Sequence, residues 1–249
     1  DSGNRPVKRP VIKTSASAFL IDKGNHRHFM QKEIYEQPVV VVQTLRSYLR
    51  PLEAQVALPD MEFDLSTVER VVIVACGTAS YVGMIGKYWI EQFARLPVEV
   101  DVASEYRYRD PVLLPNTLGV VVSQSGETAD TLAALRHMKN GGVTTAGIIN
   151  VPTSSMAREV DLLMPTHAGP EIGVASTKAF TCQLAVMAAL AVNLARAKGK
   201  LSPDEEREIV EHLTEVPAAI NAALGHDDDI AAMAHTIAAA RDVLYLGRG

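Results

Sequence analysis

The feature that most constrains the fold of this chain is a series of short, wholly apolar runs that alternate with segments of helical spacing. The first run is "VVIVA" (71–75), and a second, "LGVVV", follows at 118–122. A run that is apolar at every position is typical of a strand buried on both faces. Strands that alternate with helices predict right-handed crossovers and a parallel sheet. The expected fold class is therefore α/β, a doubly wound parallel sheet flanked by helices.

Five strands are predicted in all. The other three are "VEVDV" (98–102), "TAGIINV" (145–151) and "DLLMP" (161–165). For five strands the common flavodoxin-like order is 2-1-3-4-5, which puts strand 1 beside strand 3 where the winding reverses. Ligands of such sheets bind at that point, beyond the carboxyl ends of the strands.

The segments before the sheet predict an arm and then helices. Residues 1–28 mix Pro, Lys, Arg, Ser and Gly with little periodicity, and we interpret them as a linker or extended arm. Residues 29–69 show helical spacing, and Pro38 is expected to begin a second helix there. The α/β unit itself is expected to span residues 70–200.

Residues 201–249 are predicted to hold two connecting helices and a final strand. Ser202, Pro203 and Glu205 form a capping pattern that opens the first of these helices. The last segment, "VLYLGRG" (243–249), predicts a strand that has no partner within the chain. We therefore expect the chain to end where a second, truncated α/β unit begins.

Composition argues against several classes of function. A net charge of −5, without a long Lys/Arg run, disfavours binding to nucleic acid or to a membrane surface. The longest apolar stretch, at 184–192, is shorter than the roughly 20 residues that span a bilayer. No secretory signal is visible, and two cysteines form no disulfide framework, so a cytoplasmic location is expected. His26 and His28 are close together but lack further ligands, so no metal site is expected.

Two polar, glycine-containing loops follow strands 1 and 3. They are "CGTAS" (76–80) and "SQSGET" (123–128), and each leads into a helix. A helix N-terminus offers unpaired N–H groups and about half a positive charge, which attract an anion. Hydroxyl donors are supplied by Thr78, Ser123, Ser125 and Thr128. Since a hydrogen bond to a charged group contributes roughly 1.5–3 kcal/mol, four or five could hold a phosphate monoester without lysine.

Simpler interpretations exist for single residues of these loops. Ser125 could be a helix N-cap, with Gln124 solvated. Glu127 is expected to lie in the first helical turn and to complement the helix dipole rather than to act in catalysis. Cys76 is expected to be a packing residue rather than a nucleophile. Two such loops at the predicted switch point favour the binding interpretation for the site as a whole.

Two further segments are singled out. "GPEIGVASTKAF" (169–180) precedes a long apolar helix, which Thr177 is expected to cap. Lys178, in the first turn of that helix, is expected to be solvated. "ASEYRYRD" (103–110) fits either a surface helix or a subunit contact, and the pattern does not choose between them.

A resemblance to a known family rests on six segments: "HFMQKEIYEQP", "ACGTASY", "ASEYRYR", "SQSGETADTL", "EIGVASTKAFT" and "LGRG". Together they resemble the sugar-isomerase (SIS) domain family, and more narrowly the isomerase half of the glutamine–fructose-6-phosphate aminotransferases. The resemblance implies a cytoplasmic homodimer without metal or organic cofactor. It also implies a role in making glucosamine 6-phosphate from fructose 6-phosphate and glutamine, on the route to UDP-N-acetylglucosamine.

The resemblance implies a set of sugar-phosphate-binding residues. They are Cys76, Gly77, Thr78, Ser123, Gln124, Ser125 and Thr128 on the phosphate side, with Val174 and Ser176 on the sugar side. Family members often carry a serine where this chain has Ala79, so one hydroxyl is expected to be missing, although Ser80 stands next to it.

The same resemblance implies no catalytic residue within this chain. The acid–base and Schiff-base residues of the family lie beyond Gly249 in its pattern, and a glutaminase domain would precede Asp1. We therefore expect a fragment that binds sugar phosphate but does not convert it. The alternatives are a non-catalytic sugar-phosphate sensor and a structural unit for oligomerisation.

Overall fold

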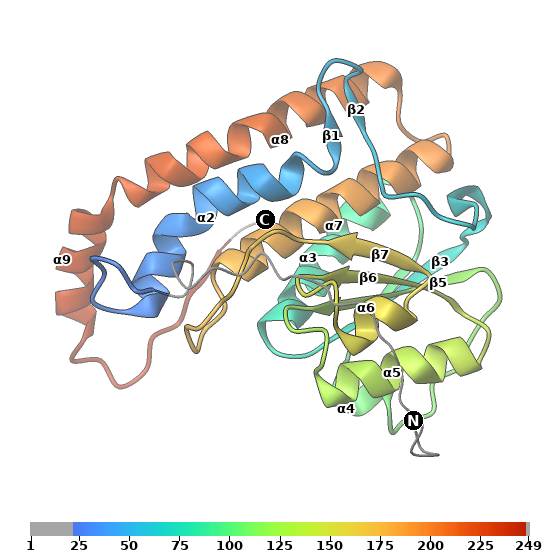
Figure 1. Ribbon diagram of the computed structural model, residues 1–249, viewed down its shortest axis with the longest axis horizontal. Helices are drawn as coiled ribbons and strands as arrows, with labels where there is room; N and C mark the ends of the chain where they lie inside the picture. The colour runs from blue at the N-terminus through green and yellow to red at the C-terminus, as the bar shows by residue number, and fades with distance from the viewer. Residues whose placement is uncertain (1–21, 248–249) are drawn as a thin grey trace, which may run out of the picture.

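The computed structural model describes residues 22–247, so most of the predicted arm (1–28) lies outside the described residues. Its centre is a five-stranded sheet with the order β4-β3-β5-β6-β7. Every neighbouring pair in this sheet is parallel (Figure 1). The strands are β3 (Arg70–Ala75), β4 (Val98–Val102), β5 (Thr117–Ser123), β6 (Thr144–Ile149) and β7 (Leu162–Pro165). Both the five predicted strands and the flavodoxin-like order 2-1-3-4-5 are confirmed.

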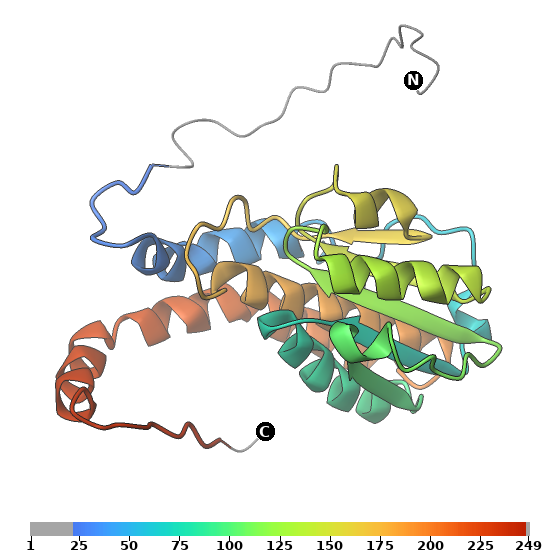
Figure 2. The same cartoon turned by 90° about the horizontal axis from the view of Figure 1, so that it is seen from below.

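Helices cover both faces of the sheet (Figures 1 and 2). One face carries α4 (Ala103–Tyr106), α5 (Ala129–Asn140) and α6 (Ser155–Glu159). The other carries α2 (Phe29–Leu45), α3 (Thr78–Phe93), α7 (Lys178–Ala197) and α8 (Pro203–Leu224). Strand β3 explains why the apolar runs were informative: Val71 and Ile73 join the core under α3 and α7, whereas Val72 and Val74 join the core under α5.

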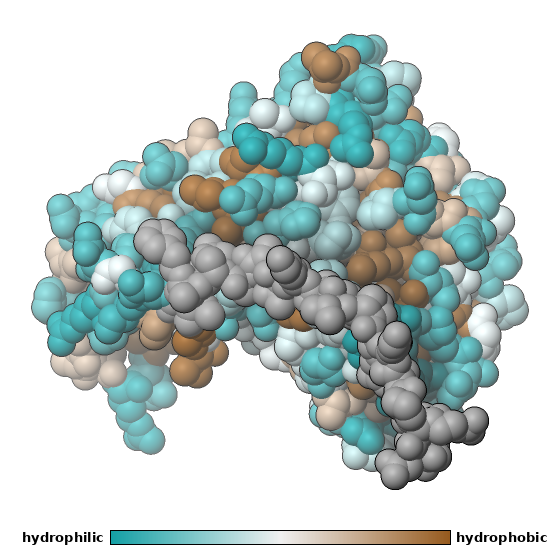
Figure 3. Space-filling model, in the orientation of Figure 1, coloured by the Kyte–Doolittle hydropathy of each residue, from teal (hydrophilic) through white to brown (hydrophobic). Residues whose placement is uncertain are grey.

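Helix α7 is the central helix of the larger core and lies between α2 and α3. Among the described residues it is the one helix whose length and composition would allow it to cross a membrane. However, 78% of its most apolar window is buried inside the protein. Burial in a core accounts for a helix that is apolar on all sides. The face shown in Figure 3 is largely hydrophilic, with apolar residues in separate patches.

The prediction of two helices divided at Pro38 was wrong. A single helix, α2, runs through Pro38, and it is followed by a hairpin of β1 (Leu49–Arg50) and β2 (Gln55–Val56). Proline removes one N–H group, which leaves the carbonyl of Ile34 without its helical donor. The side-chain amide of Gln37 donates to that carbonyl at 3.0 Å instead. This local replacement allows the helix to continue.

The C-terminal segment was predicted in part. The capping box of α8 is confirmed, because Ser202 Oγ accepts from the Glu205 backbone and the Glu205 side chain accepts from the Ser202 backbone. Helix α9 (Asp227–Ile237) follows at the end of α8 that is distant from the sheet (Figure 1). The predicted strand at 243–249 is wrong for its described part, residues 243–247. These residues are exposed and have no neighbouring strand with which to pair.

Candidate functional site

The candidate site is a cavity of about 350 Å³ beside the carboxyl ends of the central strands. Strands β3 and β5 are neighbours in register, with Ala75 opposite Val122, so the loops that follow them leave the sheet side by side. The cavity is lined by Cys76, Gly77, Thr78, Ala79, Val122, Ser123, Gln124, Ser125, Thr128, Thr131, Val174, Ser176 and Gln183. All nine residues predicted for the sugar-phosphate site are among them.

The loop after β3 turns sharply at Gly77 into α3. Gly77 has φ +59° and ψ −139°, a conformation that residues with a Cβ rarely adopt. Ser80, the predicted substitute for the missing hydroxyl at Ala79, does not line the cavity. Its Oγ donates to the carbonyl of Gly77 at 2.7 Å and so closes the turn. Ala79 itself lines the cavity, which leaves an apolar methyl group where a hydroxyl would fit.

The loop after β5 is shaped by its own hydroxyls. Ser123 Oγ accepts from the backbone N–H of Gly126 at 2.9 Å, and Ser125 Oγ accepts from that of Glu127 at 3.2 Å. A serine hydroxyl has one donor and two acceptor sites. Because both hydroxyls already accept a hydrogen bond within the loop, each keeps its proton for an acceptor in the cavity.

The N-cap interpretation of Ser125 was wrong, because α5 begins later than predicted. Its N-cap is Thr128, whose side chain makes no capping hydrogen bond. Thr128 is exposed and lines the cavity, so its hydroxyl is available there. The first N–H groups of α5 thus face the same space as the hydroxyls of the loop.

Glu127 precedes α5 and does not lie in its first turn, which corrects the prediction. Its carboxylate accepts at 2.6 Å from the backbone N–H of Ser155, at the start of α6. This hydrogen bond, together with one from the Ser155 side chain, holds the pKa of Glu127 below its ordinary value. Glu127 does not line the cavity. The finding agrees with a structural rather than a catalytic role.

The third segment of the site, residues 169–177, is also arranged differently from the prediction. Thr177 is the N-cap residue of α7 by position, but its Oγ1 is buried and has no partner. Glu171 caps the helix instead, since it accepts from the backbone of Thr177 at 2.9 Å and of Ala179 at 3.1 Å. Glu171 also accepts from Ser176 Oγ at 2.9 Å. Ser176 therefore presents only acceptor sites to the cavity, the opposite of Ser123 and Ser125.

The prediction that Lys178 is solvated was wrong, because its side chain is buried and only 4% exposed. Its Nζ donates to the carboxylate of Glu36, on α2, at 2.6 Å. The burial depends on this partner, which lies 142 residues away in the sequence. A buried ammonium group is tolerated only when it is paired.

Two polar residues of the cavity were missed. Thr131 is 1% exposed, and its Oγ1 has no hydrogen-bond partner. Gln183, on α7, is 2% exposed. The signal that could have found Gln183 is a polar side chain among apolar residues of a buried helix.

The cavity is polar but uncharged. The residues that line it include no carboxylate, imidazole, ammonium or guanidinium group. Its positive potential comes from the N-termini of α3 and α5 and from neutral donors. Among the described residues, no group of His, Cys, Asp and Glu is arranged to hold a metal ion.

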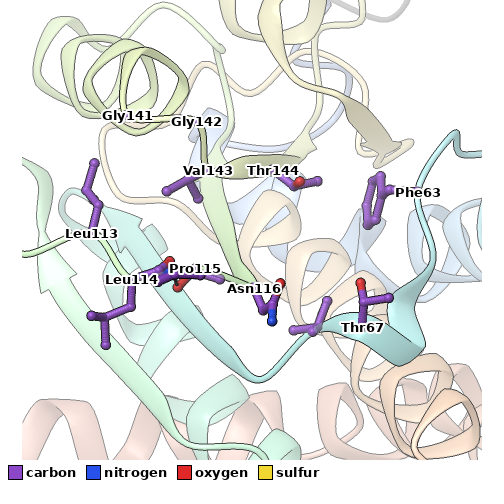
Figure 4. A pocket seen from close by; sticks show the side chains of 12 residues that line it. Phe63, Thr67, Leu113, Leu114, Pro115, Asn116, Gly141, Gly142, Val143 and Thr144 are labelled. Atoms are coloured by element: carbon purple, nitrogen blue, oxygen red, sulfur yellow. Dashed lines mark hydrogen bonds between the residues drawn. The ribbon is translucent and has the colours of Figure 1, made fainter.

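A second cavity, of about 330 Å³, lies at the amino ends of the strands, opposite the candidate site (Figure 4). Asn116 and Thr144, at the amino ends of β5 and β6, line it together with Gly141 and Gly142 after α5. A helix C-terminus carries partial negative charge, which disfavours an anion. The second cavity is thus unsuited to phosphate and contains none of the predicted residues.

The segment 103–110 forms the short helix α4 and a turn near the surface. Arg107 donates to Asp130 at 2.7 Å, and Arg109 pairs with Glu99 and Asp101 on β4. These ion pairs lie within the chain and agree with the surface-helix alternative. The subunit-contact alternative stays a prediction.

Replacement of Glu127 by Gln is expected to destabilise the protein in a pH-dependent way. Because the folded-state pKa is depressed, the unfolded chain binds more protons, and the contribution is complete above the unfolded pKa of about 4.3. It is lost as the pH falls through the folded-state pKa. Urea unfolding of both proteins between pH 7 and pH 3 should give curves that converge at low pH. A difference independent of pH would contradict this account.

Comparison with known proteins identifies the fold and its relatives. A family profile described as SIS domain matches residues 64–193. Glutamine–fructose-6-phosphate aminotransferase (isomerizing) from Zymomonas mobilis is 66% identical over 249 residues, which is 100% of this chain and 41% of that protein. The enzyme of this name from Bradyrhizobium diazoefficiens is 54% identical over 250 residues, with the same coverage of 100% and 41%.

A solved structure agrees with these relatives. The C-terminal domain of glucosamine-fructose-6-phosphate aminotransferase from Francisella tularensis has a TM-score of 0.87 and 40% identity. The match covers 92% of this chain and 65% of that one. The chain thus spans about two fifths of the length of the curated relatives. It belongs to the SIS domain family, and along its whole length it is similar to part of the glutamine–fructose-6-phosphate aminotransferases.

Proposed function

We propose that this chain supplies the sugar-phosphate-binding site of a glutamine–fructose-6-phosphate aminotransferase. Its ligands would be fructose 6-phosphate and glucosamine 6-phosphate. The observation that carries the proposal is the convergence of three separate segments, 76–79, 122–131 and 174–183, on one uncharged cavity rich in donors. Relatives that are up to 66% identical across the whole chain bear the name of this enzyme.

The chemistry of the hydroxyls supports one orientation of the ligand. Ser123 and Ser125 keep their protons for an acceptor, and a phosphate offers only acceptors near neutral pH. Ser176 donates its hydrogen bond to Glu171, so its oxygen has only lone pairs left for the cavity, and these suit the hydroxyl donor of a sugar. The phosphate would therefore lie at the N-termini of α3 and α5, with the sugar directed toward residues 174–176.

We further propose boundaries for the segments of the chain, an oligomeric state and a cellular location. Among the described residues, 29–69 form a helical and hairpin segment, 70–200 the SIS unit and 201–247 a connecting segment, whereas most of the predicted arm at 1–28 lies outside them. The chain would act as a homodimer in cytoplasmic amino-sugar metabolism that leads to UDP-N-acetylglucosamine. Tyr81, Met84 and Tyr88 form an exposed row along α3, and such apolar surface supports contact with a second copy.

The purified 249-residue chain is expected to bind fructose 6-phosphate without isomerising it. Isomerisation needs a positioned proton carrier, and the lining residues include no carboxylate, imidazole or ammonium group. A coupled assay for glucose 6-phosphate, together with an assay for glucosamine 6-phosphate in the presence of ammonia, would measure turnover. Conversion by the pure chain would contradict this expectation.

The double variant Ser123→Ala, Ser125→Ala is expected to weaken binding of fructose 6-phosphate at least tenfold. A tenfold loss corresponds to about 1.4 kcal/mol, less than two lost hydrogen bonds to a phosphate would cost. Isothermal titration calorimetry measures the dissociation constant. Ser104→Ala, on α4 and outside the cavity, is the control and should bind as the parent does. Equal binding by the double variant would refute a phosphate site in this loop.

Ala79→Ser is expected to tighten binding of the same ligand. The added hydroxyl would lie at the cavity wall, and one hydrogen bond to a charged group contributes roughly 1.5–3 kcal/mol. The dissociation constant should therefore fall about tenfold or more in the same titration. Ala129→Ser, in the first turn of α5 but not at the cavity, is the matched control. Unchanged affinity for Ala79→Ser would place the phosphate away from α3.

A further inference from the structure

The loop that carries Val174 and Ser176 is held by a carboxylate from a distant helix. Glu33, on α2, is only 2% exposed. Its Oε1 accepts from the backbone N–H of Ile172 at 2.5 Å, and both of its oxygens lie 3.1 Å from the N–H of Gly173. These partners are about 140 residues apart in the sequence. Glu33 does not itself line the cavity.

The contact is close and shaped for glycine. A Cβ at Gly173 would lie 2.5 Å from Oε2 of Glu33 and 3.3 Å from the Cα of Met30. The backbone of the loop therefore rests directly on α2. A buried carboxylate is costly unless it is hydrogen-bonded, and here the N–H groups of the loop provide those bonds.

A second anchor lies on the other side of the cavity-lining residues. Glu171 binds the backbone of Thr177 and Ala179, and it accepts from Ser176 Oγ. Between the two anchors lie only residues 174–176. The side chain of Val174 is fully exposed in this short segment, so packing does not fix its position. Its position is set by the anchors.

Helix α2 also fixes the helix into which the loop leads. Glu36 lies one turn from Glu33 on the same face of α2 and binds the buried ammonium of Lys178. The two glutamates thus fix both the loop and the first residue of α7. The phosphate-side loops, at 76–79 and 122–131, make no hydrogen bond with either glutamate.

We propose that Glu33 is a positioning residue that sets the affinity of the site for the sugar part of its ligand, separately from the phosphate. The inference rests on the proposed function. Glu33 acts through residues 172–173 on Val174 and Ser176, which face the sugar. Loss of its carboxylate should weaken the binding of fructose 6-phosphate and leave the binding of inorganic phosphate unchanged.

The test compares two ligands on the full chain. In Glu33→Gln the amide turns an N–H donor toward the N–H groups of the loop, so at least one anchor contact is lost. The dissociation constant for fructose 6-phosphate should rise about tenfold, and that for inorganic phosphate should change less than twofold. Both are measured by NMR titration of the loop amides, with thermal unfolding recorded in parallel.

Glu206→Gln is the matched control. Glu206 is also a buried carboxylate; it accepts from the backbone N–H of Val56 at 2.8 Å and from Arg196 at 2.6 Å, and it does not line the cavity. This variant should lose stability as Glu33→Gln does but bind both ligands as the parent does. A second variant, Gly173→Ala, pushes the loop off Glu33 from the other side and should reproduce the selective loss even if Glu33→Gln does not fold.

The outcomes separate the two proposals. If the parent chain binds neither ligand, the proposed function fails, and the role of Glu33 with it. If the parent binds both ligands, and the Glu33 and Gly173 variants change both affinities equally or neither, only the positioning role is refuted. A selective loss for the sugar phosphate in either variant, with no loss in Glu206→Gln, supports it.

Discussion

The parallel pairing of β3 with β5 is the constraint on which the rest of the structure depends. It brings together two loops that are nearly fifty residues apart in the sequence, because both strands end at the same edge, with Ala75 opposite Val122. The strand that separates them in the chain, β4, lies on the outside of β3. The winding of the sheet reverses between β3 and β5, and the cavity lies beyond the carboxyl ends of these strands. The cavity is thus a consequence of strand order before any particular residue is considered.

Under the proposed function, the residues that line this cavity would hold an anion without a cation. Helix N-termini and hydroxyls attract a phosphate, and none of them competes with it for a proton at neutral pH. Three of the hydroxyls already take part in hydrogen bonds within the protein. Ser123 and Ser125 accept from loop N–H groups, so they donate into the cavity, while Ser176 donates to Glu171 and accepts there. Under the proposed function, this pattern of internal hydrogen bonds would distinguish a phosphate end of the cavity from a sugar end.

The sequence was sufficient for the strands of the sheet and for the loops that line the cavity. The apolar runs predicted five strands and their order, and the small polar loops predicted the residues that meet at the cavity. Several of the errors arise from side-chain partners that the local pattern does not reveal, whether near or distant along the chain. Lys178 is buried because Glu36 pairs with it, and Thr177 does not cap α7 because Glu171 takes that place. Thr131 and Gln183 were missed because a pattern does not show which buried polar group faces a cavity.

The contacts of Glu33 and Glu36 also show which part of the chain is needed to form the site. The SIS match covers residues 64–193, and α2 (Phe29–Leu45) lies entirely before it. Yet Glu33 binds the loop that carries Val174 and Ser176 to the cavity, and α2 packs against α7, the central helix of the core. The carboxylate accepts from two N–H groups of the loop, which would otherwise need water or another acceptor. The physical unit of the site therefore includes α2, and the family boundary at residue 64 cuts through it.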